Sequence, residues 1–225
     1  MSECLNWCDA HNEICKISDN FDLHAKRIQS LLEQGYTDES IILIVVIFEV
    51  LLKDLFKTCR GAWIHCGKGS DISHMNLDDK LEARKKIMKY LEDVRAYDKF
   101  LKNYYVYQCD DPYPETETLY QTLFGKTEVI NFQNIKNNDG AHKAYKVFFD
   151  INLMKMLDTD EKSSYKKWKL LQELIEQRHQ IVHSGESTTL IKEEIGTILQ
   201  SLIFMKNSLE IKCLSFYGIP RRMNQ

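Results

Sequence analysis

The run Ile41-Ile42-Leu43-Ile44-Val45-Val46-Ile47-Phe48, followed by Val50-Leu51-Leu52, is the most hydrophobic stretch of the 225-residue chain. Thr37 precedes it as a good helix N-cap, so the pattern predicts a helix over about 38–59. A membrane-spanning helix needs about 20 apolar residues in a row, and this run is broken too early for that. The interrupting residues are Glu49, Lys53 and Asp54. We therefore expect the central buried helix of a bundle, or a helix buried between two subunits.

The composition of the whole chain also favours helices. The chain is 44% hydrophobic and 28% charged, and it holds only three prolines and nine glycines, so long segments lack helix breakers. Further helices are expected at about 20–34, 77–102, 141–157, 162–184 and 190–214, with an irregular insertion near 103–140. These patterns predict a single all-α domain over 1–225, a bundle of about five to seven helices.

Charge and cysteine content restrict the function classes. A net charge of -3 argues against a general nucleic-acid coat or a basic membrane binder, although a local basic site remains compatible with it. Seven cysteines without a signal peptide indicate a reducing compartment, so we expect a cytoplasmic protein with mostly free thiols.

The N-terminal residues 1–18 form a Cys/His-rich helical pattern with two interpretations. Cys4, Cys8, His11 and Cys15 follow one another at spacings of 4, 3 and 4, which places them on one helix face. One metal ion cannot reach all four along a helix, so a zinc site needs ligands from elsewhere, such as residues 59, 65 or 66. The alternative is that the small cysteine face packs on the core.

The segment richest in potential chemistry is Glu176-Gln177-Arg178-His179-Gln180-Ile181-Val182-His183-Ser184-Gly185. It packs an arginine and two histidines into the end of a predicted helix, which Gly185 terminates. His179 and His183 share a face, as zinc-binding histidines often do, but the peptidase pattern needs glutamate where Gln180 stands, and no third ligand is evident. A purely structural interpretation is that these basic groups interact with the carbonyls and negative end of the helix.

The third interpretation of this segment is phosphate chemistry. The planar guanidinium of Arg178 suits a phosphate or a phosphorus transition state, and His183 can exchange a proton near neutral pH. RNA supplies its own nucleophile, the 2′-hydroxyl, so such a site needs no metal or other cofactor. Arg178 and His183 are five residues apart, or about 140° around an ideal helix. They do not converge from one helix, and two copies across a two-fold axis would complete one cleft.

These residues carry a family resemblance. Arg178-His179-Gln180-Ile181-Val182-His183 resembles the Arg-(polar)-x-x-x-His motif of the HEPN superfamily (higher eukaryote and prokaryote nucleotide-binding domains), with His179 at the polar position. The decapeptide from Ile47 to Phe56 is similar to an early helix of the prokaryotic branch related to RiboL-PSP-type HEPN domains, and Phe132-Gln133-Asn134-Ile135 is similar to that branch too. The resemblance covers roughly residues 20–210.

The resemblance implies a HEPN-like all-α fold and a metal-independent endoribonuclease, active as a homodimer and acting as a toxin or antiphage defence effector. Arg178 and His183 would be the catalytic pair, and His179 a supporting polar residue. The alternative is a non-catalytic RNA-binding or regulatory module with a protein partner, such as an antitoxin or a nucleotidyltransferase.

Two further sets of residues are candidates for supporting this site. Glu49 is a carboxylate on a strongly apolar helix, where an unpaired charge is costly. We expect it to orient Arg178 or His179, unless it faces solvent or Lys53. Three lysines on the helix of the motif can follow a phosphate backbone, unless they form an ordinary solvated face. They are Lys166, Lys167 and Lys169.

Overall fold

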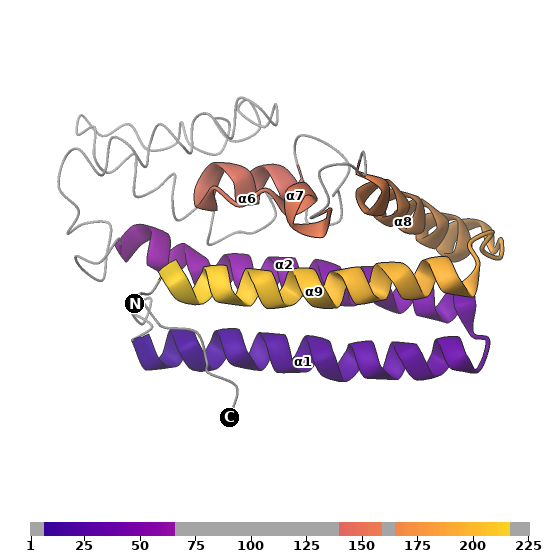
Figure 1. The fold of residues 1–225 in the computed structure, drawn as a ribbon, viewed down its shortest axis with the longest axis horizontal. Helices are drawn as coiled ribbons and strands as arrows, with labels where there is room; N and C mark the ends of the chain where they lie inside the picture. Colours follow the sequence, from indigo (N-terminus) through magenta and orange to yellow (C-terminus); the bar gives the residue numbers. More distant parts are fainter. Residues whose placement is uncertain (1–6, 66–139, 159–164, 217–225) are drawn as a thin grey trace, which may run out of the picture. The chain divides into compact units, whose positions relative to one another are not determined.

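The computed structural model describes residues 7–65, 140–158 and 165–216, which form six α-helices and no β-strand (Figure 1). The predicted all-α class is therefore confirmed for this part of the chain. None of the helices within these ranges is long and apolar enough to cross a membrane. The helix expected at 77–102 and the insertion expected near 103–140 lie outside the described residues. The helices are α1 (Trp7–Glu33), α2 (Thr37–His65), α6 (Ala141–Phe149), α7 (Leu153–Leu157), α8 (Lys166–Ser184) and α9 (Lys192–Phe216).

Helix α1 is continuous, which corrects the expectation of an N-terminal helix over 1–18 and a second one from Asn20. Asp19 and Asn20 resemble a break because both are weak helix formers. Their side chains are exposed on the helix surface, and each keeps the backbone N–H that a proline would lack. The helix therefore passes through them and ends before Gly35, whose φ of +87° is a conformation that glycine adopts readily.

The single helix expected over 141–157 is also wrong, because it is divided at Asp150. This residue has φ 55° and ψ 32°, the left-handed conformation, and its N–H bonds to the carbonyl of Tyr145. Aspartate tolerates this conformation better than most residues do. Helix α6 therefore ends at Phe149, and α7 begins at Leu153.

The chain divides into two compact units, and the boundary passes through α2 between Leu55 and Phe56. The first unit includes the end of α2, helix α6 and the residues up to Asn152. Its described core is aromatic: the Phe56 ring lies 5.7 Å from Tyr145, 5.8 Å from Phe148 and 5.0 Å from Phe149, centroid to centroid. These edge-to-face contacts stabilise the pairing of α2 with α6 beyond the burial of apolar area alone.

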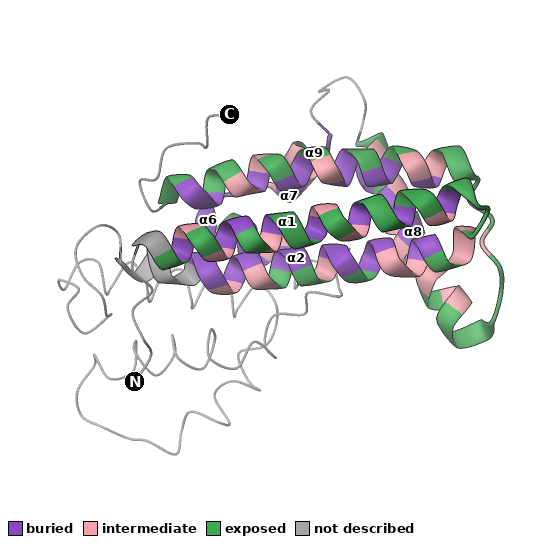
Figure 2. Ribbon diagram, turned by 90° about the horizontal axis from the view of Figure 1, so that it is seen from below, coloured by how far each residue is buried: buried purple, intermediate pink, exposed green. Residues whose placement is uncertain are grey.

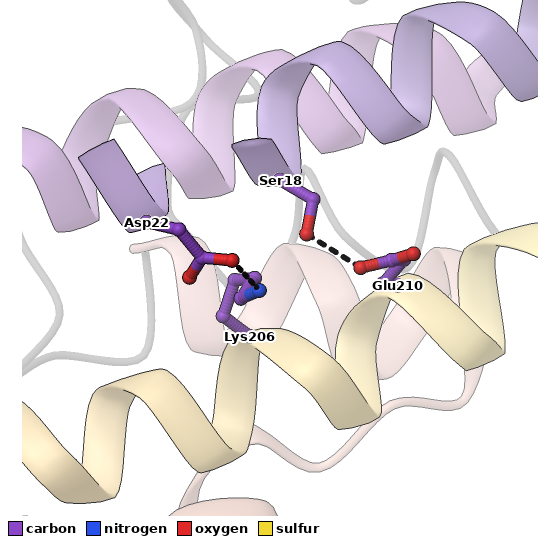
Figure 3. Close-up of polar contacts among 4 residues, drawn as sticks. All are labelled: Ser18, Asp22, Lys206 and Glu210. Carbon is purple, nitrogen blue, oxygen red and sulfur yellow. Dashed lines mark hydrogen bonds and ion pairs between the residues drawn. The ribbon is translucent and has the colours of Figure 1, made fainter. Parts of the chain in front are cut away.

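The second unit contains Trp7–Leu55 and the chain from Leu153 onward. Helix α9 packs against α1, α7 and α8. Two polar contacts join α1 to α9: Ser18 donates a hydrogen bond to Glu210, and the Lys206 ammonium lies 2.8 Å from the Asp22 carboxylate (Figure 3). A step of four residues forward on α1 corresponds to four residues back on α9, so the two helices are antiparallel.

Buried and exposed residues alternate around the long helices of this unit, so each helix has a buried side and an exposed side (Figure 2). This is the amphipathic pattern of helices that share a core. Buried side chains include Phe21, Ile28 and Leu32 on α1, Phe48 and Leu52 on α2, and Ile198, Leu202 and Leu209 on α9.

Candidate functional site at the end of helix α8

The start of α8 is held by an acidic side chain from outside the helix. Asp158 is buried, and its two carboxylate oxygens accept hydrogen bonds from the backbone N–H groups of Lys167 and Trp168, at 3.1 and 3.0 Å. It thereby satisfies two of the N–H groups that a helix start leaves without partners. Tyr165, directly before the helix, is in the left-handed conformation and makes no side-chain cap. Asp158 therefore performs the capping function that the adjacent residue does not.

The end of α8 has the glycine termination expected from the sequence. Gly185 has φ 67° and ψ 19°, and its N–H bonds to the carbonyl of Ile181 at 3.2 Å. The following loop is tied down at two points. The Thr188 N–H donates to Asp38 of α2 at 2.8 Å, and the Thr189 N–H donates to the Gln177 side chain at 3.1 Å. The last turn of α8 is thus anchored to the start of α2.

Arg178 is half-buried in this last part of α8. Its Nε is buried and has no hydrogen-bond partner among the residues that the structure describes. The Arg178 charge acts on Glu49 of α2: burial raises the pKa of Glu49, and the nearby guanidinium partly offsets this rise. Arg178 and Glu49, 129 residues apart in sequence, therefore interact electrostatically. Whether Glu49 orients Arg178 for a reaction stays a prediction.

His179 and His183 lie together on the solvent side of the same helix end. Both are exposed, and their ring centroids are 4.4 Å apart at an angle of 47°. Arg178 is half-buried beside Glu49, whereas His183 faces solvent, as their separation of about 140° around the helix predicts. The last turns of α8 thus present two imidazoles outward and a guanidinium toward α2.

The three lysines of α8 do not form one surface. Lys166 and Lys169 are exposed, whereas Lys167 is half-buried and lines an open cavity of about 590 Å³ with residues of α1 and α9, among them Leu32 and Gly196. Lys169 precedes His183 by 14 residues, about 21 Å along the helix axis at 1.5 Å per residue. Only Lys166 and Lys169 are therefore free to meet a phosphate backbone, at some distance from the histidines.

Exposed apolar side chains accompany the site. Val182 on α8 is 47% exposed, and Val46 and Val50 on α2 are 37% and 42% exposed. The two α2 valines flank Glu49 in the sequence, one turn of helix apart. Helix α2 is thus buried only in part within one chain, which differs from the prediction of a central buried helix and leaves the alternative of a helix buried between two subunits untested. Sequence reasoning missed this surface because a run that is apolar on every side does not reveal which side faces solvent.

The N-terminal Cys/His face is described in part. Cys15 is buried, and its sulfur lies 3.8 Å from Nε2 of His11, whereas Cys4 and the side chain of Cys8 lie outside the described residues. Among the residues with described positions, no group of three or more His, Cys, Asp or Glu side chains is arranged to hold a metal ion. The burial of Cys15 agrees with the packing interpretation for that residue.

Several residues that shape this region had no visible role in the sequence. Asp158, Asp38 and Gln177 anchor the two ends of α8 through hydrogen bonds to backbone groups. Asp158 and Asp38 act across gaps in sequence that no local pattern predicts. Gln177 lies 12 residues before Thr189, which is also beyond the reach of a local pattern.

Comparisons of the chain with protein-family models, curated proteins and solved structures give no match. The resemblance to the HEPN superfamily therefore stays a prediction from the sequence, which rests on the Arg178–His183 pattern and its position at the end of a late helix.

Proposed function

We propose that the chain is a HEPN-type endoribonuclease that cleaves RNA without a metal, at a cleft formed by two copies of the chain. The observation that carries the proposal is the end of α8, where a half-buried Arg178 interacts with Glu49 while His179 and His183 are exposed. This arrangement combines a positive charge near α2 with two imidazoles that are open to a substrate.

The reaction uses a nucleophile that RNA itself carries. The 2′-hydroxyl loses its proton to water as its oxygen attacks the adjacent phosphorus. The bond from phosphorus to the 5′-oxygen then breaks, and a 2′,3′-cyclic phosphate forms. Arg178 stabilises the negative charge that develops on the phosphoryl oxygens, and His183 donates a proton to the departing 5′-oxygen. His183 lies in the last turn of α8 and its side chain is exposed, so the imidazole is open to a substrate from solution. His179 supports this pair as a polar neighbour.

A second copy of the chain explains how the divergent groups of one helix can share a cleft. Arg178 and His183 point into different surroundings, so one copy would supply the arginine that meets the histidine of the other. The exposed valines 46, 50 and 182 supply apolar surface beside the site for such a contact. The proposal thus predicts activity only in the dimer.

Glu49 acts in this proposal as a positioning residue, because its interaction with Arg178 restrains the guanidinium without placing Glu49 on the substrate. Lys166 and Lys169 contact the RNA backbone away from the scissile bond, which strengthens binding independently of sequence. The biological role that fits is that of a toxin or antiphage effector controlled by a protein partner.

The direct test is RNA cleavage by the purified chain and by His183→Ala. We expect chelator-resistant cleavage with 2′,3′-cyclic phosphate ends, and a loss of about 10²–10⁴-fold in the variant, the usual contribution of general acid–base catalysis. The matched control is His24→Ala on α1, a histidine outside the site, which should cleave like the parent. Arg178→Lys keeps the charge but loses the planar fork, so its activity should also fall.

The oligomeric state and the partner provide the remaining evidence. Sedimentation should show a dimer, and His183→Ala should remain a dimer with parental helix content. If His183→Ala cleaves as fast as the parent, the catalytic assignment is wrong. A parent that does not cleave RNA but binds a partner protein tightly would favour the non-catalytic regulatory module instead.

A further inference from the structure

The two imidazoles at the end of α8 lie next to each other on the surface of the helix. His179 and His183 are separated by one helical turn, both are exposed, and their ring centroids are 4.4 Å apart. In zinc peptidases, two histidines four residues apart on one helix direct their rings at a single metal ion. Because the helix backbone fixes this spacing, only side-chain rotation is needed for both rings to face a common point.

The distance between the two rings is close to the distance that a shared metal ion requires. A metal–nitrogen bond of about 2.0–2.1 Å, with about 1.1 Å from nitrogen to ring centre, puts each centroid about 3.2 Å from the metal. If the two metal–nitrogen bonds meet at about 90° at the metal, the ring centroids are about 4.5 Å apart. At the tetrahedral angle they are about 5.2 Å apart. The 4.4 Å between the ring centroids lies within about 1 Å of both values, so a small rotation of the side chains brings both rings onto one ion.

The number of ligands determines what kind of site this is. Within the described part of the chain, no third His, Cys, Asp or Glu joins the pair. Two protein ligands leave the other positions to water, so the ion exchanges with solution and contributes no structural framework. The order of affinity should follow the general order for nitrogen ligands, with Cu²⁺ above Ni²⁺ and Ni²⁺ above Co²⁺.

We propose that His179 and His183 together chelate one divalent transition-metal ion, and that this ion inhibits RNA cleavage. The coordinated nitrogen of His183 has its lone pair on the metal and cannot carry a proton to the leaving oxygen. The inhibitory consequence rests on the proposed ribonuclease function, whereas the binding site rests on the ring geometry alone. The ion is a regulator of this site and takes no part in the cleavage chemistry.

Binding is tested by titrating Ni²⁺ into the full chain, without a polyhistidine tag and with the cysteines kept reduced by a phosphine. Calorimetry should show a site whose affinity falls at least tenfold in His179→Ala and equally in His183→Ala. Both side chains are exposed, so both variants should keep the parental circular dichroism. His24→Ala is the matched control and should bind like the parent. His11→Ala separately reports nickel held by the His11–Cys15 pair.

Inhibition is tested by adding Ni²⁺ to the cleavage reaction. The midpoint of inhibition should agree with the calorimetric dissociation constant, and a chelator should restore cleavage fully. Nickel binding that is unchanged in both His179→Ala and His183→Ala overturns the site, whether or not RNA is cleaved. If nickel binding requires both histidines in a chain that cleaves no RNA, the ribonuclease proposal fails while the metal site stands.

Discussion

The ion pair between α1 and α9 is buried on one side only, which predicts an asymmetric response to mutation. The Lys206 Nζ lies 2.8 Å from Oδ2 of Asp22, yet the Lys206 side chain is only 4% exposed whereas that of Asp22 is 41% exposed (Figure 3). Removing the carboxylate leaves an ammonium buried without its partner. Removing the ammonium leaves a carboxylate that water can reach. The two halves of one contact should therefore differ in cost.

The magnitudes follow from the exposure of each partner. Breaking a fully buried pair costs about 3–5 kcal/mol, and because Asp22 lies partly in water we expect Asp22→Ala to lower the free energy of unfolding by about 2–3 kcal/mol. Lys206→Met keeps a similar apolar stem and removes the buried charge, so its cost should be below about 1 kcal/mol. The double variant should resemble Lys206→Met, because no buried charge remains in it.

The assay is urea unfolding followed by circular dichroism, with the four proteins of a double-mutant cycle. Asp19→Ala is the matched control, since Asp19 is an exposed aspartate on the same helix and reports the gain in helix propensity alone. Equal costs for Asp22→Ala and Lys206→Met, or a double variant less stable than Asp22→Ala, would refute the reasoning.

Three further predictions concern α8 and its surroundings. Asp158→Ala should lower the free energy of unfolding by about 2 kcal/mol, because two backbone N–H groups lose a charged acceptor, and Asp158→Asn should cost less in the same urea assay. Burial raises the pKa of Glu49 in the folded state above its ordinary value of about 4.5. The protonated carboxyl therefore favours folding, and this contribution to the free energy of unfolding is lost as the pH rises from about 4.5 through the higher pKa of the folded state. Urea unfolding at several pH values should show the parent losing stability relative to Glu49→Gln over that window, and parallel curves would contradict it. Gly185→Ala should cost about 1 kcal/mol from the left-handed backbone alone, since its added Cβ meets nothing within 4 Å.

The helix class and the end of α8 could be predicted because their causes are local. Apolar periodicity and scarce helix breakers identify helices, and Gly185 follows the last periodic residue, where a left-handed cap belongs. The continuity of α1 through Asp19 and Asn20 was missed, since weak propensity is overridden when the flanking turns pack on a core. The division at Asp150 depends on a single backbone conformation that aspartate permits but does not require.

The relative directions of the candidate residues on α8 could be predicted from the sequence, whereas their surroundings could not. The spacing places His179 and His183 on one face of the helix and Arg178 on another. The two histidines are exposed and Arg178 is half-buried, which agrees with this placement. Asp158 could not be found, because its partners lie 9 and 10 residues away across a segment without a local motif. The exposed side of α2 was equally hidden, since Val46 and Val50 look like the buried valines and isoleucines around them.

The antiparallel contact of α1 with α9 also has a kinetic consequence. Its two polar contacts join residues 192 and 184 positions apart in the chain. At a synthesis rate of roughly 5–20 residues per second, about 10–40 s separate the emergence of the two partners from the ribosome. During that interval the side of α1 that α9 covers has no partner from α9, so the nascent chain exposes apolar surface to chaperones and to its own copies. Contacts of such long range also form slowly, so the docking of α9 should limit the rate at which this unit folds.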